Sequence, residues 1–254
     1  MIVETEELTV VFRAGWSRRT LTALDRVNLS VREGDFFALL GPNGAGKSTA
    51  LHCMLGLLRP NSGEARVFGR RLRLGCAELR DVAYLPEEPH YHDYLTVEEA
   101  VVYYARLSGL DARPQRIREV LERLDLAKVR SVRVAVCSKG MKQKVGIAHC
   151  LLQQPRLLLL DEPMRGLDPV ATKDFRDALV ELNRGGVTIV MNSHLLSEVE
   201  LVANRAAILA DGRLVAVDEV ASLVGRDDAA RDGSRRTLED AFLALVREGR
   251  RAHA

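Results

Sequence analysis

The sequence has few aromatic residues and no long apolar run. Phe, Trp and Tyr together make up 5% of its 254 residues. Its most apolar segments, Leu157–Leu160 and Val187–Met191, are far shorter than the roughly 20 residues that a helix needs to cross a bilayer. The N-terminus lacks the basic start, apolar stretch and small-residue cleavage site of a signal peptide. We therefore expect a cytoplasmic chain whose role at a membrane, if it has one, needs another polypeptide.

Paired cysteines and a strong net charge are also absent. The four cysteines form no CxxC and lack the spacing of zinc ligands, so we interpret them as reduced thiols. They are Cys53, Cys76, Cys137 and Cys150. The 37 Lys and Arg residues nearly balance 35 Asp and Glu residues, which gives no reason to expect nucleic acid or an acidic substrate. The 47% hydrophobic content suits one sizeable globular domain, alone or with a subdomain.

The first quarter of the chain predicts strands, then a glycine loop, then a helix. The predicted strands are Leu8–Phe12, Val27–Val31 and Asp35–Leu40. From Lys47 to Leu58, apolar residues recur at steps of three and four, which predicts a helix. A helix that directly follows a strand and a glycine cluster is the setting that phosphate-binding loops require.

Helices dominate the predicted structure of the middle of the chain. Thr96 and Glu99 form a capping box that begins one helix, and Pro114 begins another. A third helical stretch covers Ser138–Gln153. Residues 91–154 are therefore predicted to be a helical insert.

Strands and helices alternate again after this insert. The apolar runs Leu157–Leu160 and Val187–Met191 are typical of buried parallel strands, and a helix is predicted between them over Asp174–Leu182. A polar loop is predicted at Arg226–Arg236. After it, apolar residues spaced from Leu238 onward predict an amphipathic helix, followed by a basic tail.

A phosphate-binding loop is the sharpest local motif. The sequence GxxxxGK[ST] is matched by Gly41, Pro42, Asn43, Gly44, Ala45, Gly46, Lys47, Ser48 and Thr49. In such a loop backbone N–H groups face the phosphates, Lys47 projects from an exposed loop to the β- and γ-phosphates, and Ser48 offers its hydroxyl to Mg²⁺. The alternative is a chance glycine turn, which composition alone produces in roughly one such chain in a hundred.

Two carboxylates end the apolar run at Leu157–Leu160. Asp161 would hold Mg²⁺, and Glu162 would polarise the water that attacks the γ-phosphate. The alternative is a helix start, in which Asp161 or Glu162 caps the helix and Pro163 occupies its first turn. The neighbouring phosphate loop favours the interpretation as a nucleotide site.

These motifs, together with four further matches in order, resemble the ABC ATPase family over nearly the whole chain. The further matches are the signature Cys137–Met141, the D-loop Gly166–Pro169, the switch histidine in Asn192–His194 and the adenine-stacking Phe12. The resemblance implies that Ser138 and Gly140 bind nucleotide and that His194 binds the γ-phosphate. It also implies that Glu87, at the place of the family's glutamine, is an oxygen ligand of Mg²⁺.

Several matched residues have simpler alternatives. Trp16 rivals Phe12 as the residue that stacks on adenine. His194 follows an apolar strand, where a structural histidine is common. Ser138 could be a helix N-cap, which is compatible with an anion site at the same helix start.

Four residues depart from the family's pattern. Lys139 and Met141 replace a glycine and a glutamine of the signature, and Glu87 replaces a glutamine. Arg165 stands before Gly166, where the family more often has a small residue, and no pattern in the sequence accounts for it. These departures leave the nucleotide site intact but raise the question of how it is coupled to transport.

The resemblance implies an α/β fold: a P-loop NTPase, RecA-like core with N-terminal antiparallel β strands and an inserted α-helical subdomain. The predicted ABC ATPase domain covers residues 1–225, with the core at 1–90 and 155–225 and the helical subdomain at 91–154. Residues 226–254 then form a C-terminal loop, an amphipathic helix and a tail. In the family two such domains close head to tail, so that each ATP contacts both.

The implied cofactors are therefore ATP and Mg²⁺, and the implied partners are an integral membrane permease subunit and a second ATPase subunit. This places the chain on the inner face of the cell membrane. The segment Arg236–Phe242 resembles the ending of exporter ATPases and favours export over import. The loop with Tyr91 and Tyr94 lies where such subunits face the membrane partner, and both aromatics suit that contact.

Other functions remain as alternatives. A non-transport ABC ATPase is disfavoured because translation factors usually carry two domains and repair proteins a long coiled coil, and the sequence predicts neither. A GTPase on the same loop would need NKxD, which the sequence lacks. A metal cluster can be imagined from five nearby side chains, but they lie in a polar loop without fixed ligand spacing. They are Glu87, Glu88, His90, His92 and Asp93.

Overall fold

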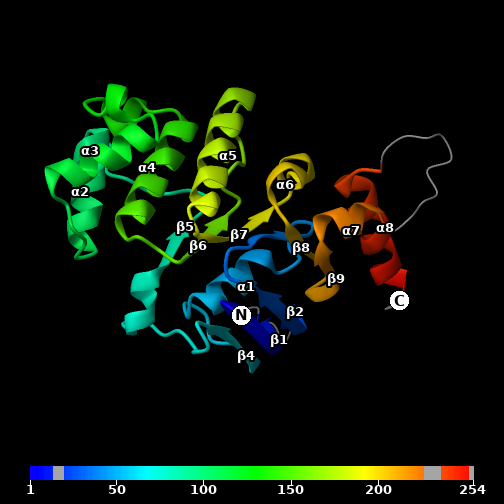
Figure 1. The fold of residues 1–254 in the computed structure, drawn as a ribbon. Helices are drawn as coiled ribbons and strands as arrows, with labels where there is room; N and C mark the ends of the chain where they lie inside the picture. Colours follow the sequence, from blue (N-terminus) through cyan, green and yellow to red (C-terminus); the bar gives the residue numbers. More distant parts are fainter. Residues whose placement is uncertain (14–19, 226–235, 252–254) are drawn as a thin grey trace. The chain divides into compact units, whose positions relative to one another are not determined.

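The computed structural model describes residues 1–13, 20–225 and 236–251, which belong to two compact units (Figure 1). Unit 1 comprises residues 1–79 and 188–254, and unit 2 comprises residues 80–187. Trp16, most of the predicted loop Arg226–Arg236 and the end of the basic tail lie outside the described residues.

Unit 1 contains an antiparallel sheet with the strand order β2-β1-β4. Its strands are β1 (Val3–Arg13), β2 (Thr20–Val31) and β4 (Ser62–Val67). The predicted strands Leu8–Phe12 and Val27–Val31 are confirmed, whereas β4 was not predicted. Gly63 has φ 70°, and a Cβ there would lie 2.2 Å from Glu7 O. Only glycine therefore fits this crossing of β4 and β1.

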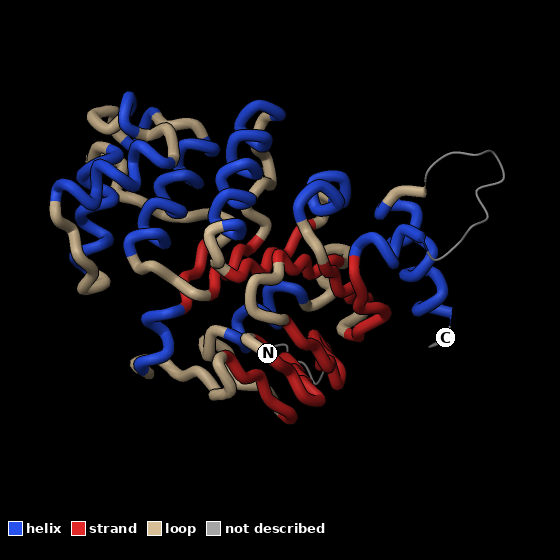
Figure 2. Tube along the Cα trace, viewed as in Figure 1, coloured by secondary structure: helices blue, strands red, loops and turns tan. Residues whose placement is uncertain are grey.

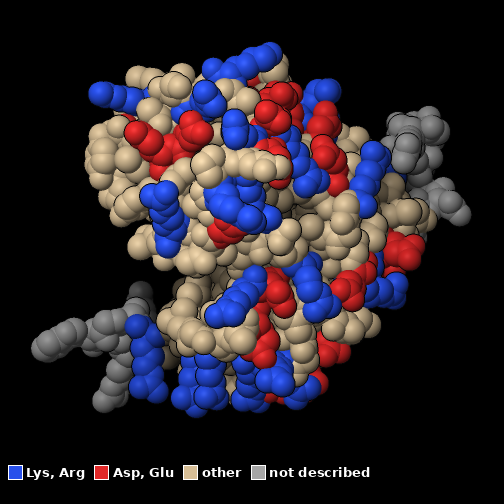
Figure 3. Space-filling model, turned by 60° about the vertical axis from the view of Figure 1, so that its left-hand side comes forward, with Lys and Arg blue, Asp and Glu red and all other residues tan. Residues whose placement is uncertain are grey.

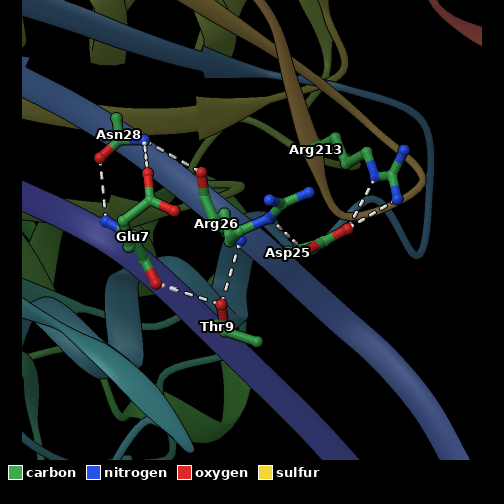
Figure 4. A network of polar contacts seen from close by, with 6 residues as sticks. All are labelled: Glu7, Thr9, Asp25, Arg26, Asn28 and Arg213. Atoms are coloured by element: carbon green, nitrogen blue, oxygen red, sulfur yellow. Dashed lines mark hydrogen bonds and ion pairs between the residues drawn. The ribbon is translucent and has the colours of Figure 1, made fainter. Parts of the chain in front are cut away.

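A polar network surrounds the irregular part of the β1–β2 pairing (Figure 4). Glu7 has φ 47°; its backbone N–H donates to Asn28 Oδ1 at 2.9 Å and its carboxylate accepts from Asn28 Nδ2 at 2.7 Å. Next to it, Arg213 pairs with Asp25 at 2.7 Å. Hydrogen bonding from the Arg213 guanidinium lowers the pKa of Asp25. The network compensates for ladder hydrogen bonds that the bulges interrupt.

The second sheet of unit 1 supports the glycine loop. In it β3 (Phe36–Leu40) lies parallel to both β7 (Thr188–Ser193) and β8 (Arg205–Ala210), and β9 (Arg213–Glu219) is antiparallel to β8. Every residue of β3, β7 and β8 is buried, as expected for the inner strands of a covered parallel sheet. The predicted strands at Asp35–Leu40 and Val187–Met191 are confirmed.

The α-helices in the described part of unit 1 are α1 (Lys47–Met54), α6 (Leu196–Val202), α7 (Val220–Gly225) and α8 (Leu238–Arg251). The amphipathic α8 was predicted and packs against β8, β9, α6 and α7. The prediction that α1 continues to Leu58 was wrong. The chain turns at Gly56, which has φ 69° and whose Cβ would lie 2.4 Å from Leu72 O.

Unit 2 combines a pair of strands with several helices; Figure 2 draws the helices of the whole chain in blue and the strands in red. Here β5 (Val82–Leu85) lies parallel to β6 (Leu157–Asp161). The helices are α2 (Val97–Leu107), α3 (Pro114–Arg123), α4 (Lys139–Leu152) and α5 (Pro169–Arg184). The capping box of Thr96 and Glu99 and the start of α3 at Pro114 are confirmed. Because α4 contacts α2, α3 and α5, it is the central helix of this unit.

The surface and the thiols agree with the composition. Lys and Arg side chains alternate with Asp and Glu on the face that Figure 3 shows. All four cysteines are free, and Cys53, Cys137 and Cys150 are buried. None of the helices in the described part of the chain combines the length and the apolar composition needed to span a membrane.

Candidate functional site

The glycine loop lies between β3 and α1 in unit 1. Gly46 has φ 98°, and a Cβ there would lie 2.3 Å from Ala23 O and 2.7 Å from Leu24 Cδ2, so no other residue fits. Gly46 is also the N-cap of α1, and no side chain caps this helix. The positive end of the helix dipole therefore lies at the loop, which favours an anionic ligand there.

Lys47 differs from the prediction of a lysine on an exposed loop. It is 6% exposed, and its ammonium donates to Gly41 O at 2.7 Å and to Pro42 O at 3.3 Å. A buried charge needs such partners, because burial without hydrogen bonds is costly. The loop thus folds around the charge of Lys47 and holds it at the start of α1.

The end of β7 lies beside this loop. Leu40 of β3 is opposite Ser193 of β7, so both strands end at the same edge of the sheet. Asn192 is fully buried, and its Nδ2 donates to Ser48 Oγ at 3.4 Å. His194, the next residue after β7, is exposed. The phosphate loop and the predicted switch histidine therefore follow β3 and β7, which are neighbouring strands of unit 1.

Phe12 lies near the end of β1 and is 42% exposed. This exposure shows that Phe12 is not part of the hydrophobic core. Its Cα is opposite Leu21 of β2, which is also exposed. Phe12 therefore offers an apolar face to a planar ligand.

The carboxylates of unit 2 stand at the end of β6. Asp161 ends the strand and Glu162 follows it, and both are 7% exposed. Tyr84 donates its hydroxyl to Asp161 Oδ2 at 3.5 Å, and burial, reinforced by the Asp161 carboxylate, raises the pKa of Tyr84. Glu162 has φ 45°, a backbone conformation that is unfavourable for residues other than glycine. Such strain is concentrated at functional sites.

The alternative interpretation of Asp161–Pro163 as a helix start is wrong. Helix α5 begins at Pro169, where Asp168 caps it by accepting from Val170 N at 3.0 Å and Ala171 N at 2.9 Å. The prediction had placed the start of this helix at Asp174. The two carboxylates of Asp161 and Glu162 thus belong to a strand end and the turn that follows.

The signature segment forms the start of α4. Ser138 is the N-cap and accepts from Met141 N at 3.2 Å. A Cβ at Gly140 would lie 2.9 Å from Ala171 Cβ, so this glycine allows α4 and α5 to approach. The capping alternative for Ser138 is confirmed, and it leaves the exposed Ser138 at a helix N-terminus, as an anion site requires.

Three of the four departures from the family's pattern lie near one another in unit 2. Glu87 pairs with Arg165 at 2.5 Å. A Cβ at Gly166, the next residue, would lie 3.3 Å from Lys139 Nζ. Sequence reasoning missed these contacts, and it also missed Gln143, whose Nε2 donates to Glu87 O at 2.8 Å.

The predicted magnesium ligands fit that ion in their chemistry. Ser48, Glu87 and Asp161 offer only hydroxyl and carboxylate oxygens, which Mg²⁺ prefers. Within residues 1–13, 20–225 and 236–251, no group of three or more His, Cys, Asp or Glu side chains could hold a metal. Few protein ligands are expected where substrate phosphates supply the others.

Comparison with known proteins identifies the family. The family model for ABC transporters matches residues 24–165. An uncharacterized ABC transporter ATP-binding protein of Synechocystis is 37% identical over 232 residues, which are 89% of this chain and 65% of the relative. A similar protein of Nostoc is 40% identical over 230 residues, 88% of this chain and 68% of the relative. The bacitracin transport ATP-binding protein of Bacillus licheniformis is 36% identical over 216 residues, 84% and 68% respectively. The chain spans about two thirds of the length of these relatives.

Solved structures agree with these relatives. An ATP-binding subunit of an ABC transporter matches with a TM-score of 0.78 and 32% identity, covering 96% of this chain and 99% of that one. A dimeric ATP-binding cassette in a post-hydrolysis state with ADP and Pi matches with a TM-score of 0.75 and 25% identity, covering 85% and 98%. The predicted α/β, P-loop NTPase fold is confirmed by these cassettes. The chain belongs to the ABC transporter family.

Proposed function

We propose that this chain is the ATP-binding and ATP-hydrolysing subunit of an ABC transporter, which powers export through a separate integral membrane permease subunit. The observation that carries the proposal is the phosphate loop, with Gly46 in a conformation only glycine adopts and the charge of Lys47 held at the start of α1. The named function of the Bacillus licheniformis relative, bacitracin transport, supports it.

In the proposed site, unit 1 binds the nucleotide. Phe12 stacks on adenine, and the residues from Gly41 to Thr49 surround the phosphates. The ammonium of Lys47 exchanges its carbonyl partners, Gly41 O and Pro42 O, for β- and γ-phosphate oxygens, which are stronger acceptors. His194 contacts the γ-phosphate from the end of β7. These roles support binding of ATP with the γ-phosphate placed for attack.

Hydrolysis is assigned to Glu162. Its carboxylate accepts a hydrogen bond from a water and orients the water oxygen toward the γ-phosphorus. The new P–O bond forms as the bond from the γ-phosphorus to the bridging oxygen breaks, which yields ADP and phosphate. The proton that the water loses passes to the Glu162 carboxylate and from there to solvent. Mg²⁺ bound by Ser48, Asp161 and Glu87 would offset the charge of the phosphates. Asp161 is kept in place by the Tyr84 hydroxyl, and the strained turn fixes Glu162 beside it.

The proposal includes a second ATPase subunit. Ser138 and Gly140, at the start of α4, bind the ATP that the phosphate loop of the other chain holds. The dimeric relative with bound ADP and Pi supports this arrangement. The exposed Tyr94 is proposed to contact the permease, with the chain on the inner face of the cell membrane. Tyr91 instead packs within unit 2, where its ring centroid lies 5.5 Å from that of Tyr104. The boundaries at residues 91, 154 and 225 remain part of this proposal.

The proposal predicts that the purified chain releases phosphate from ATP only with a divalent cation. Measured by phosphate release with excess Mg²⁺ and again with excess EDTA, the rate is expected to fall at least about tenfold in EDTA. Ser48 and the carboxylates then lack the ion that offsets the phosphate charge. Hydrolysis that persists unchanged in EDTA would contradict the magnesium assignment, and its absence under both conditions would contradict ATPase activity.

A further inference from the structure

Glu87 and Arg165 are both unusual for the family, and unit 2 brings them into direct contact. Arg165 Nη1 lies 2.5 Å from Glu87 Oε1, although 78 positions separate the two residues in the sequence. An ion pair between distant loops leaves no periodic trace in a sequence. The contact therefore supplies a physical account of Arg165 that the motifs could not.

The backbone of Glu87 is fixed by helix α4. Gln143 is fully buried, and its Nε2 donates to Glu87 O at 2.8 Å. One turn further along α4, a Cβ at Gly146 would lie 2.3 Å from Leu85 Cδ1 and 2.8 Å from Tyr91 Oη. Helix α4 thus contacts this loop before, at and after Glu87. Because the backbone of Glu87 is held in place, its carboxylate lies where Arg165 can pair with it.

The backbone of Arg165 is fixed by the turn that carries Glu162. Arg165 N donates to Glu162 O at 3.1 Å, and Met164, one of the two residues between them, is 2% exposed. The ion pair therefore joins the loop after β5 to the turn after β6. The side chain that pairs with Glu87 therefore belongs to Arg165, three residues after the proposed catalytic residue Glu162.

The fold does not depend on this ion pair. The side chains of Arg165 and Glu87 are 51% and 34% exposed, and pairs in such positions contribute little to stability. The pair of Arg123 and Glu181, 42% and 63% exposed at 3.0 Å, is comparable and lies in the same unit. The Glu87 pair differs in where it places charge. Glu87 adds a negative charge at the position where the family has a neutral glutamine, and Arg165 cancels that charge.

We propose that Arg165 is the counter-ion of Glu87, and that it lets a carboxylate stand at this position without repelling the phosphates of ATP. The inference rests on the proposed function, since it places Glu87 near the nucleotide. Arg165 is a positioning residue in this account: it acts on the nucleotide through Glu87. Removing the guanidinium alone leaves one uncompensated negative charge, whereas removing both charges restores neutrality.

The test is a double-mutant cycle with Arg165→Met and Glu87→Gln. Calorimetry measures the affinity of each variant for ATP at low salt, with EDTA present to remove divalent cations. Arg165→Met is expected to weaken binding about threefold, and Glu87→Gln, which leaves Arg165 unpaired, to strengthen it by a similar factor. The double variant and Arg165→Lys should bind like the wild type. Arg123→Met is the matched control, with unchanged affinity. In 0.5 M salt the single effects should shrink, because screening weakens interactions between exposed charges.

The outcomes separate the inference from the proposed function. If the wild type binds ATP and Arg165→Met binds it with the same affinity as the control Arg123→Met, the counter-ion role is overturned. A double variant as weak as Arg165→Met would also overturn it, because Arg165 would then act without Glu87. If Arg165→Met does not fold, the tighter binding expected for Glu87→Gln, with Arg165 in place, still decides. A wild-type chain that binds no ATP would instead contradict the proposed function itself.

Discussion

Glu162→Gln is expected to lower the rate of ATP hydrolysis about a hundredfold or more while ATP still binds. The amide keeps the shape and the hydrogen bonds of the side chain but cannot polarise water as a carboxylate does. Because hydrolysis no longer separates the subunits, the bound nucleotide should hold two chains together. Phosphate release measures the first effect, and size exclusion with MgATP measures the second.

Glu181→Gln is the control for this variant, since Glu181 lies in the same unit and its side chain is exposed on α5. It should hydrolyse ATP at the wild-type rate. If Glu162→Gln keeps near-normal hydrolysis, the assignment of Glu162 is wrong. If it is inactive but remains a monomer with MgATP, the proposed closure of two subunits around ATP loses its support.

Lys47→Met is expected to weaken MgATP binding roughly a hundredfold, which corresponds to about 3 kcal/mol for a lost charge-assisted contact with phosphate. Methionine is preferred to a smaller residue such as alanine because Lys47 is buried, and Met fills a similar volume without the charge. Calorimetric titration gives the affinity, and thermal unfolding shows whether the fold is retained.

Lys173→Met serves as the control for charge, because Lys173 is exposed on α5 and pairs with Asp177, one turn further along the same helix. Its affinity for MgATP should equal that of the wild type. A Lys47→Met protein that unfolds normally and binds MgATP with wild-type affinity would mean that the phosphate loop is not the binding site.

The parts of the fold that could be predicted are those in which local pattern and tertiary environment agree. The apolar runs at β3, β6 and β7 are fully buried. The positions of the glycine loop, Asp161–Glu162 and His194 at the ends of these strands could therefore be predicted. Thr96 and Pro114 also marked helix starts correctly. In each case the signal is contained within a few neighbouring residues.

Tertiary contacts and non-repeating loop contacts explain what could not be predicted. Gly63 and Gly56 adopt left-handed conformations because backbone atoms of Glu7 and Leu72 approach them, and this ended α1 early and allowed β4 to form. The burial of Lys47 depends on two carbonyls of its own loop. The pairing of Glu87 with Arg165 joins loops that follow different strands. None of these contacts leaves a repeating pattern in the sequence.

The most direct test of the whole account is recovery of ATPase activity from two inactive variants. In a two-fold dimer, each site takes Lys47 from one chain and Ser138 from the other. Lys47→Met and Ser138→Arg should each be inactive alone, since each damages both sites of its own dimer. A mixed dimer gathers both lesions in one site and leaves the other intact. With equal amounts, free exchange and independent sites, phosphate release should return to roughly a quarter of the wild-type rate. If labelled subunits exchange and no activity returns, two chains do not share the site as we propose.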